Sequence, residues 1–375
     1  MPRAKSSTLN LSARTLWPKK TELLGLTLNL QALDDSPLYP QYTIGLHAWF
    51  LQQIQQFDPE LSAYLHDGES EKSFNISGLN GQFTTHSREL QLQKDQSYQW
   101  HVNALSQRTV AGLERWLRQL PDEVELKNAP LTIKDVQIEH PPTTYAQLYK
   151  QGQAQSGSVS LSFLSPTSFR RKGHHLPIPW PTNVFHSYLR RWNDFSGKPV
   201  DQDDFLDWVD TYVIIQQHHL ESQKIAAGKR GSVTGFVGAI AYGLSRQAST
   251  QPEFAALFYT LTQLAPYCST GHKTTFGLGQ TRLGWQSTLP TPEVPAVEVL
   301  LAERMAELTA TFMDQRKRQG GNRAQKTAEI WATILARREW GHPLQDIADD
   351  LEMHYKTVKS YSKLARRSLR EITEG

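Results

Sequence analysis

The sequence holds a single cysteine, Cys268, among its 375 residues. One thiol excludes an internal disulfide and any zinc site built from paired thiolates, which favours a reducing compartment and a protein without a metal ion. The longest apolar runs, such as GFVGAIAYGL, are well short of the ~18 residues that a membrane span needs. The first residues, MPRAKSSTLNL, lack the apolar core of a signal peptide. We therefore expect a cytoplasmic protein with no membrane partner and no cofactor.

A large excess of charge is also missing. The net charge is only +3, from 40 Lys and Arg against 37 Asp and Glu, although the sequence pI is near 8.8. This mild basicity permits a nucleic-acid partner without establishing one. At about 150 residues per domain, the length predicts two or three domains.

The first third of the chain predicts strands and helices in a recognisable order. In TELLGLTLNLQAL, alternating leucines predict a half-buried strand: Leu24, Leu26, Leu28 and Leu30. Residues at three- and four-residue spacing then predict a helix: Ile44, His47, Ala48, Leu51 and Ile54. DPELSAYLH predicts a second short helix with Asp58 as its N-cap. With the strands ELQLQ, SYQWHVNAL and LTIKDVQIEH and the helix VAGLERWLRQL, this is the order of a ferredoxin-like unit.

A similar order begins again at Val159. It runs through the strand VSLSFLSP, the helix NVFHSYLRRWNDF, a helical or loop insertion around DQDDFLDWVDTYVII, the strand SVTGFVGAIAYGL and the helix QPEFAALFYTLTQL. The proline-rich TLPTPEVPAVEV predicts a linker, and the chain beyond it reads as helical. The expected fold class is α+β: two tandem ferredoxin-like domains over 1–145 and 146–290, followed by a small all-α helix-turn-helix domain over 291–375.

The last region contains PLQDIADDLEMHYKTVKSYSKLARR, which resembles the DNA-binding helix-turn-helix of bacterial regulators. The residues that such a motif buries are Ile347, Ala348, Leu351, Val358 and Tyr361. Glu352 stands at the turn position where glycine is usual. The second helix carries a basic strip whose candidate nucleic-acid contacts are Lys356, Lys359 and Lys363, with Arg366, Arg367 and Arg370 behind them. The alternative is a helical bundle whose basic face is solvated or docks on another protein.

A second distinctive stretch is GHKTTFGLGQT, from Gly271 to Thr281. A Walker loop requires Gly-Lys-Ser/Thr before a helix, and a dinucleotide fingerprint requires a third glycine where Arg282 stands, so both motifs fail. What remains is a loop whose bare amides approach a polyanion, with Lys273 supplying charge. The alternative is a glycine-rich hairpin that only needs unusual backbone angles.

This loop, placed after a second ferredoxin-like order, resembles the glycine-rich loop of the CRISPR-associated repeat-cleaving endoribonucleases of the RAMP superfamily. DPELSAYLHDGESEKSFNISGL, SPTSFRRKG, PIPWPTNVFHSYLRRWNDF and TGFVGAIAYGL resemble further segments of that family, particularly of cyanobacterial-type members. The resemblance covers roughly Thr21 to Trp285 and leaves the C-terminal helices outside. It implies a metal-independent cut of precursor CRISPR RNA within the repeat, in which a ribose 2′-OH attacks and leaves a 2′,3′-cyclic phosphate and a 5′-OH.

The resemblance also implies which residues carry out this reaction. His66 matches the family's catalytic histidine, and Lys72 matches the lysine that stabilises the transition state. Leu51 stands where some members have a catalytic tyrosine, so His47, one turn earlier, becomes the second candidate for the acid and base steps. The alternative for His47 is a core histidine on the apolar stripe of its helix.

RNA binding is the remaining implication. The candidate RNA contacts are Gly271, His272, Lys273, Thr274, Gly277, Gly279 and Gln280 in the loop, and Arg170, Arg171 and Lys172 in a basic segment. Arg190 and Arg191 either follow the RNA backbone or pair with Asp194 or other acids. The expected partner is CRISPR repeat RNA, with DNA or a CRISPR effector complex as candidates for the C-terminal domain. The competing hypotheses are a non-catalytic repeat-RNA-binding or DNA-binding regulatory protein on the same fold, and a transcription regulator whose N-terminal part senses a ligand.

Overall fold

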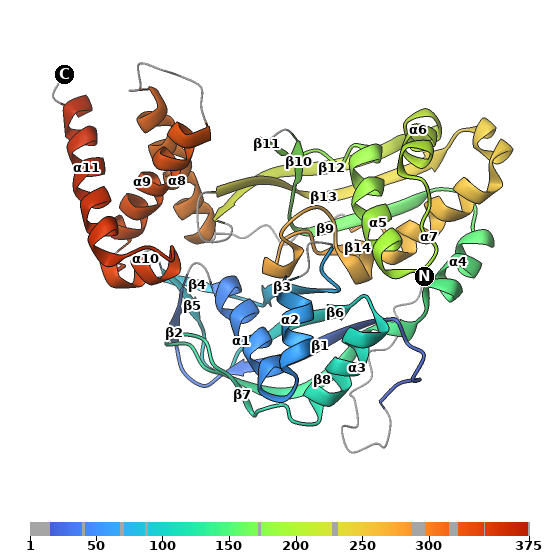
Figure 1. Ribbon diagram of the computed structural model, residues 1–375, viewed down its shortest axis with the longest axis horizontal. Coiled ribbons are helices and arrows are strands. Elements are labelled where there is room, and N and C mark those ends of the chain that lie inside the picture. The colour runs from blue at the N-terminus through green and yellow to red at the C-terminus, as the bar shows by residue number, and fades with distance from the viewer. Residues whose placement is uncertain are drawn as a thin grey trace.

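The computed structural model contains two units of mixed helix and sheet and a group of helices at one end (Figure 1). The structure describes residues 16–39, 42–67, 71–86, 89–171, 174–226, 232–286, 297–314, 322–340 and 342–373. Residues 288–296 of the predicted linker lie outside these ranges. None of the described helices is both long enough and apolar enough to cross a membrane.

The first unit is built on an antiparallel sheet with the strand order β3-β6-β1-β8-β7. Its strands are β1 (Leu23–Ala32), β3 (Phe74–Asn80), β6 (Ser97–Ala104), β7 (Glu123–Val124) and β8 (Leu131–Thr143). Its helices are α1 (Tyr42–Phe57), α2 (Pro59–Asp67) and α3 (Gln107–Leu117). The connection β1-α1-β3-β6-α3-β8 with this strand order is the predicted ferredoxin-like arrangement, except that the predicted strand ELQLQ lies in a separate small sheet and β3 takes its place.

The core of this unit lies between the sheet and the helices α1 and α3. The four alternating leucines of β1 are fully buried, as their period of two predicts. The predicted buried face of α1 is partly wrong, because the large side chains of Trp49 and Phe50 occupy the core while Ala48 is exposed. His47 therefore lies at the edge of the buried face, where its ring is half-buried rather than enclosed in the core.

The second unit repeats the same plan with the strand order β12-β13-β9-β14. Its strands are β9 (Val159–Thr167), β12 (Val213–Ala226), β13 (Ser232–Leu244) and β14 (Thr281–Leu283). Its helical segments are α4 (Tyr145–Gln153), α5 (Pro181–Phe195), α6 (Gln202–Tyr212), η1 (Arg246–Thr250) and α7 (Pro252–Cys268). The second ferredoxin-like prediction is confirmed, with one correction. The segment predicted as an insertion, 201–215, forms α6 and then the start of strand β12, and the rest of β12, up to Ala226, was not predicted.

Two further small sheets lie outside the main sheets of these units. The first consists of β2 (Ser36–Leu38), β4 (Thr84–His86) and β5 (Glu89–Leu92). The second is the pair β10 (Phe169–Arg171) and β11 (His174–Leu176), in which Arg170 lies opposite His175. Arg170 and Arg171 of the basic segment predicted to bind RNA therefore lie in this strand pair.

The third unit consists of the helices α8 (Val297–Asp314), α9 (Asn322–Glu339), α10 (Leu344–Asp350) and α11 (Tyr355–Thr373). Ile347, Ala348, Leu351 and Val358 form one buried cluster, as the helix-turn-helix pattern predicts. After α10 the chain turns sharply, and the Met353 amide donates to the Ala348 carbonyl at 2.9 Å. This bond and the apolar contact of Met353 are the features of a helix C-terminus closed by one left-handed residue.

That left-handed residue is Glu352, with φ at 52°, so the turn forms without the usual glycine. A side chain in this conformation costs about 1 kcal/mol relative to glycine. We expect Glu352→Gly to stabilise the third unit by about that amount, measured as a rise in the midpoint of its thermal unfolding. Glu352→Ala keeps the Cβ atom and should leave the midpoint nearly unchanged. A lower midpoint for the glycine variant would show that the left-handed turn carries no strain.

Polar contacts attach the third unit to the first. The fully buried Arg337 of α9 donates to the Tyr39 hydroxyl and, at 2.6 Å, to Asp350 Oδ2. Lys127, between β7 and β8, forms an ion pair with Asp346 of α10. Helix α8 packs along the β12 and β13 pair of the second unit. The helix-turn-helix is therefore held against both ferredoxin-like units (Figure 1).

Candidate active site

The glycine-rich loop connects α7 to β14 and also contacts the first unit. Its centre is a short 3-10 turn, η2 (Thr274–Phe276). Gly277 forms a parallel bridge with Ser77 of β3, and the Thr275 carbonyl lies 3.0 Å from His47 Nδ1 of α1. The loop therefore brings the first helix and an edge of the first sheet against the second unit.

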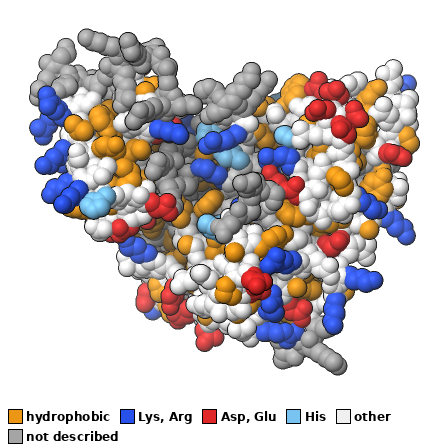
Figure 2. Space-filling view, viewed as in Figure 1, with side chains coloured by type: hydrophobic (Ala, Val, Ile, Leu, Met, Phe, Trp, Pro, Cys, Tyr) orange, Lys and Arg blue, Asp and Glu red, His pale blue; other side chains and the backbone are white. Residues whose placement is uncertain are grey.

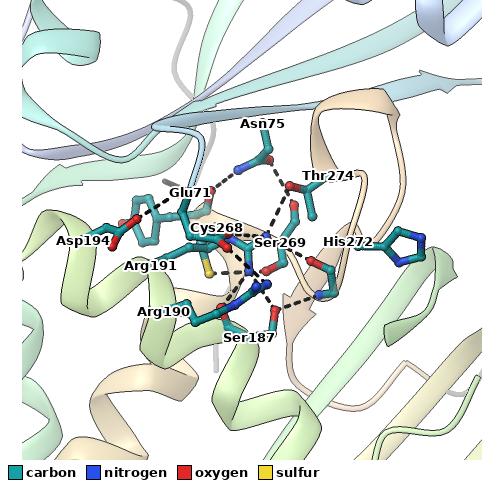
Figure 3. A network of polar contacts seen from close by, with 12 residues as sticks. Glu71, Asn75, Ser187, Arg190, Arg191, Asp194, Cys268, Ser269, His272 and Thr274 are labelled. Carbon is teal, nitrogen blue, oxygen red and sulfur yellow. Dashed lines mark hydrogen bonds and ion pairs between the residues drawn. The ribbon is translucent and has the colours of Figure 1, made fainter. Parts of the chain in front are cut away.

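Buried polar contacts anchor the base of this loop (Figure 3). Asn75 Nδ2 of β3 donates to the Tyr267 carbonyl at 2.6 Å, and Ser269 Oγ donates to Asn75 Oδ1 at 3.0 Å. From α5, Arg191 Nη2 donates to the Gly271 carbonyl at 3.0 Å. These contacts fix both ends of the segment from Tyr267 to Gly271, one from each unit.

The two arginines of α5 pair with an acid of the first unit. Arg190 and Arg191 both contact Glu71, at 3.2 Å and 3.4 Å between side-chain nitrogen and oxygen. Asp194 accepts the backbone amide of Glu71 at 2.8 Å instead of pairing with either arginine. Of the two predicted roles, the structure shows pairing with an acid, and Arg191 is only 4 % exposed.

The glycines of the loop are required by close packing. Gly271, Gly277 and Gly279 have φ values of 82°, 83° and 74°, a conformation that side chains rarely adopt. A Cβ atom at Gly279 would lie 1.9 Å from the Thr270 carbonyl oxygen. These glycines are therefore needed for the unusual backbone angles that the alternative interpretation, a glycine-rich hairpin, requires, and for close packing.

The loop amides are largely engaged within the protein. The donors are Gly271 to Ser187 Oγ, His272 to the Ser168 carbonyl, Gly279 to the Pro166 carbonyl and Gln280 to Ser165 Oγ. These four amides do not point freely at a polyanion, contrary to the expectation of a bare backbone cradle.

His47 is the histidine in contact with the loop. Its ring packs on Phe276, with the ring centroids 4.5 Å apart, and stacks against Phe74. The pKa of His47 is lowered to about 4, mainly by burial and less by the charges of His66 and Lys72, against the contact with the Thr275 carbonyl, which raises it. Because a carbonyl oxygen can only accept, the proton of the neutral ring is on Nδ1 and the lone pair is on Nε2.

His66 and Lys72 lie close enough to His47 for their charges to lower its pKa. His66 is exposed at the end of α2 and lines a surface hollow of about 350 Å³ together with Leu51. The ammonium of Lys72 donates to the His66 carbonyl at 2.5 Å. The three candidate catalytic residues therefore come together from two helices and the start of β3. Leu51 contributes no hydroxyl to this site.

A cationic cluster lies on the second-unit side of the loop. His272 stacks on His175 with centroids 5.1 Å apart, and Figure 3 shows its ring pointing away from the anchoring network. Lys273 has a left-handed backbone, with φ at 59°. The pKa of Lys273 is lowered to about 8, mainly by burial and less by the charge of Arg170, against the charge of Glu329 of α9, which raises it.

The other predicted residues are spread more widely. Thr274 is buried in the loop, with its Oγ1 3.5 Å from Arg191 Nη2. Arg171 lies in β10, where only its backbone is described, and Lys172 lies outside the described residues. The C-terminal candidates are on α11, in a different unit from the histidines: Lys356, Lys359 and Lys363.

Sequence reasoning missed the residues that hold the loop. Asn75, Glu71 and the Thr275 carbonyl act through contacts with partners far along the chain. A polar residue between the apolar Phe74 and Ile76 is the weak signal for Asn75, and its burial at 2 % makes the contact significant. A backbone carbonyl has no sequence signal.

Two family profiles match this chain. The profile described as Cas6 N-terminal domain matches residues 24–149, and the profile described as CRISPR-associated endoribonuclease Cas6 matches residues 161–281. Together they cover the two ferredoxin-like units and leave the third unit unmatched. No curated protein sequence matches the chain.

Solved structures show the same fold over the same part. The product complex of Cas6 (TTHB231) is 22% identical with a TM-score of 0.59, and the matched region is 70% of this chain and 100% of that chain. TTHB231 is a Thermus thermophilus protein. The product complex of Cas6 (TTHA0078) is 26% identical with a TM-score of 0.54, and the matched region is again 70% of this chain and 100% of that chain. The substrate mimic complex of the same protein gives a TM-score of 0.52.

Proposed function

Because the chain belongs to the family of CRISPR-associated endoribonucleases called Cas6, we propose that it cleaves precursor CRISPR RNA within the repeat. We further propose that the ribose 2′-OH is the nucleophile and that no metal ion takes part. The solved relatives hold a product and a substrate mimic. We place the catalytic unit at 1–145, the loop-bearing unit at 146–290 and the helical unit at 291–375.

The observation that carries this proposal is the state of His47. Its Nδ1 is bonded to the Thr275 carbonyl, and a ring with a pKa near 4 is neutral at pH 7, so Nε2 holds a lone pair. A lone pair fixed in direction is what a general base requires. A bound phosphate would raise the pKa of this ring, because a nearby negative charge favours the protonated form, and would make His47 a stronger base.

The reaction then divides among three side chains. His47 Nε2 takes the proton of the 2′-OH while that oxygen attacks the adjacent phosphorus. His66 gives a proton to the 5′ oxygen as the bond from phosphorus to that oxygen breaks. The ammonium of Lys72 stabilises the negative charge that grows on the phosphorane oxygens. The products are a 2′,3′-cyclic phosphate and a 5′-OH, and the proton count balances.

RNA binding is proposed for the charged side chains of Arg170 and Lys273, with the ring of His272, whose pKa burial lowers, beside them. The pKa of Lys273 near 8 in the free protein makes this contact sensitive to pH. The ammonium is charged below that pKa and is lost above it, so we expect the Kd for repeat RNA to begin to rise as the pH passes about 8. Binding titrations from pH 6.5 to about 9.5 measure this rise.

The control for this prediction is Lys273→Arg. Arginine keeps its charge over the whole range, so the rise in Kd above pH 8 should disappear in this variant. If the variant and the wild type show the same pH dependence, a different group titrates and Lys273 does not contact the RNA.

The proposed function is tested by incubating the full chain with a repeat RNA of its own genome in excess EDTA and mapping the product ends. A single cut with a cyclic phosphate and a 5′-OH supports the proposal. A cut that needs added metal would overturn the metal-independent chemistry. Tight binding without a cut would favour the alternative function, a non-catalytic repeat-RNA-binding protein on this fold.

A further inference from the structure

The third unit has a helix with two distinct faces. At about 100° per residue, the basic side chains of α11 fall within an arc of about 100°, and all are exposed: Lys356, Lys359, Lys363, Arg366, Arg367 and Arg370. The opposite face is packed on the rest of the unit through Val358, Ser362 and Ala365. The charges therefore form one strip along the outer side of a helix whose inner side is fixed.

The acids of α10 whose ion pairs are known face away from this strip. Asp346 and Asp350 of α10 are turned toward Lys127 and Arg337, in the contact with the first unit. No ion pair between described residues involves Lys356, Lys359 or Lys363. Figure 2 shows Lys and Arg side chains along the outer edge of the molecule, at the position of α11 in Figure 1. The three lysines therefore lie on a face away from the ion pairs that join α10 to the first unit.

We propose that this outer face of α11 binds duplex DNA in the major groove. The B-DNA major groove is about 12 Å wide and admits one α-helix, which is about 10–12 Å across. Lysines near the start of α11 would contact phosphates on the groove walls, and the exposed Tyr355 and Leu364 beside the strip supply surface for base edges. The helix-turn-helix fixes α11 against α9 and α10, so the face is presented without rearrangement.

Double-helical RNA fits this face less well. The major groove of A-form RNA is too narrow and deep for side chains to read, and a helix cannot enter it. Single-stranded RNA is bound mainly by stacking on aromatic rings, and the strip itself contains none. The proposal concerns a surface outside both family matches and does not depend on the cleavage reaction.

The test uses the full chain and one sequence of about 30 base pairs, prepared as fluorescent duplex DNA and as duplex RNA. We expect the DNA to bind more tightly. The variant Lys356→Glu, Lys359→Glu, Lys363→Glu should weaken DNA binding by about 100-fold or more at about 0.1 M salt. It should also reduce the slope of log Kd against log salt by about three, because three phosphate contacts are lost.

The matched control reverses three exposed lysines of the ferredoxin-like units: Lys134→Glu, Lys150→Glu, Lys198→Glu. It makes the same change in net charge and should keep most of the DNA affinity. Cleavage of repeat RNA should be unchanged in the α11 variant, and its far-ultraviolet dichroism should match the wild type. Equal loss in both variants, equal binding of DNA and RNA, or no DNA binding by the wild type would each overturn the proposal.

Discussion

His47→Ala is expected to lower the single-turnover rate of repeat cleavage about 1,000-fold, with little change in the affinity for RNA. The size follows from the loss of a general base whose lone pair is directed by the Thr275 carbonyl at 3.0 Å. RNA affinity should persist because Arg170 and Lys273, the charged groups proposed to bind RNA, lie on the other side of the loop. The measurement is a cleavage time course with excess protein, together with a binding titration of an RNA that carries a 2′-deoxy sugar at the cut.

His218→Ala is the control for this prediction, because His218 is exposed on β12 in the second unit. It should cleave at the wild-type rate. The pH profile adds an independent check, since kcat/KM reports the groups of the free enzyme. With the pKa of His47 near 4 rather than its ordinary 6.5, kcat/KM should hold down to about pH 5. If His47→Ala cleaves at the wild-type rate, His47 is not the general base and only packs against the loop.

The sheets were predictable where one face of a strand is buried. The leucines of β1 alternate because one side of the strand faces the core, and this alternation can be read from the sequence. Strand β12 was missed because it is an edge strand, and most of its side chains between Ile214 and Ile225 are at least partly exposed. It is held by backbone pairing with β13, which leaves no periodic pattern in the side chains.

The side chains of the candidate site could be named from the sequence, but the groups that contact them could not. The resemblance pointed to His66 and Lys72, and the helix to His47, and the structure brings the three together. The expectation of bare amides is wrong for Gly271 and Gln280, because oxygens of α5 and β9 accept their hydrogen bonds, and sequence spacing does not reveal such distant acceptors.

Arg191→Ala is expected to destabilise the protein by about 3 kcal/mol, because it removes a buried charge that links α5, Glu71 and the loop. Its guanidinium donates to the Gly271 carbonyl at 3.0 Å and to Ser187 Oγ at 2.7 Å, and its side chain is 5 % exposed. The thermal midpoint should fall by about 5–10 °C. Repeat cleavage should slow as well, since the same loop carries the carbonyl that orients His47.

Arg190→Ala is the matched control, since Arg190 contacts the same Glu71 from the adjacent position but is 43% exposed. A solvent-exposed ion pair contributes at most about 1 kcal/mol, so this variant should keep nearly the wild-type midpoint and cleavage rate. Both variants remove one positive charge beside Glu71, but only Arg191 is buried. The comparison therefore separates the effect of losing the charge from the effect of losing a buried arginine. Equal losses in the two variants would mean that the charge on Glu71 matters and the anchoring of Gly271 does not. A cleavage defect in Arg191→Ala alone would show that the buried arginine acts through the loop on the orientation of His47.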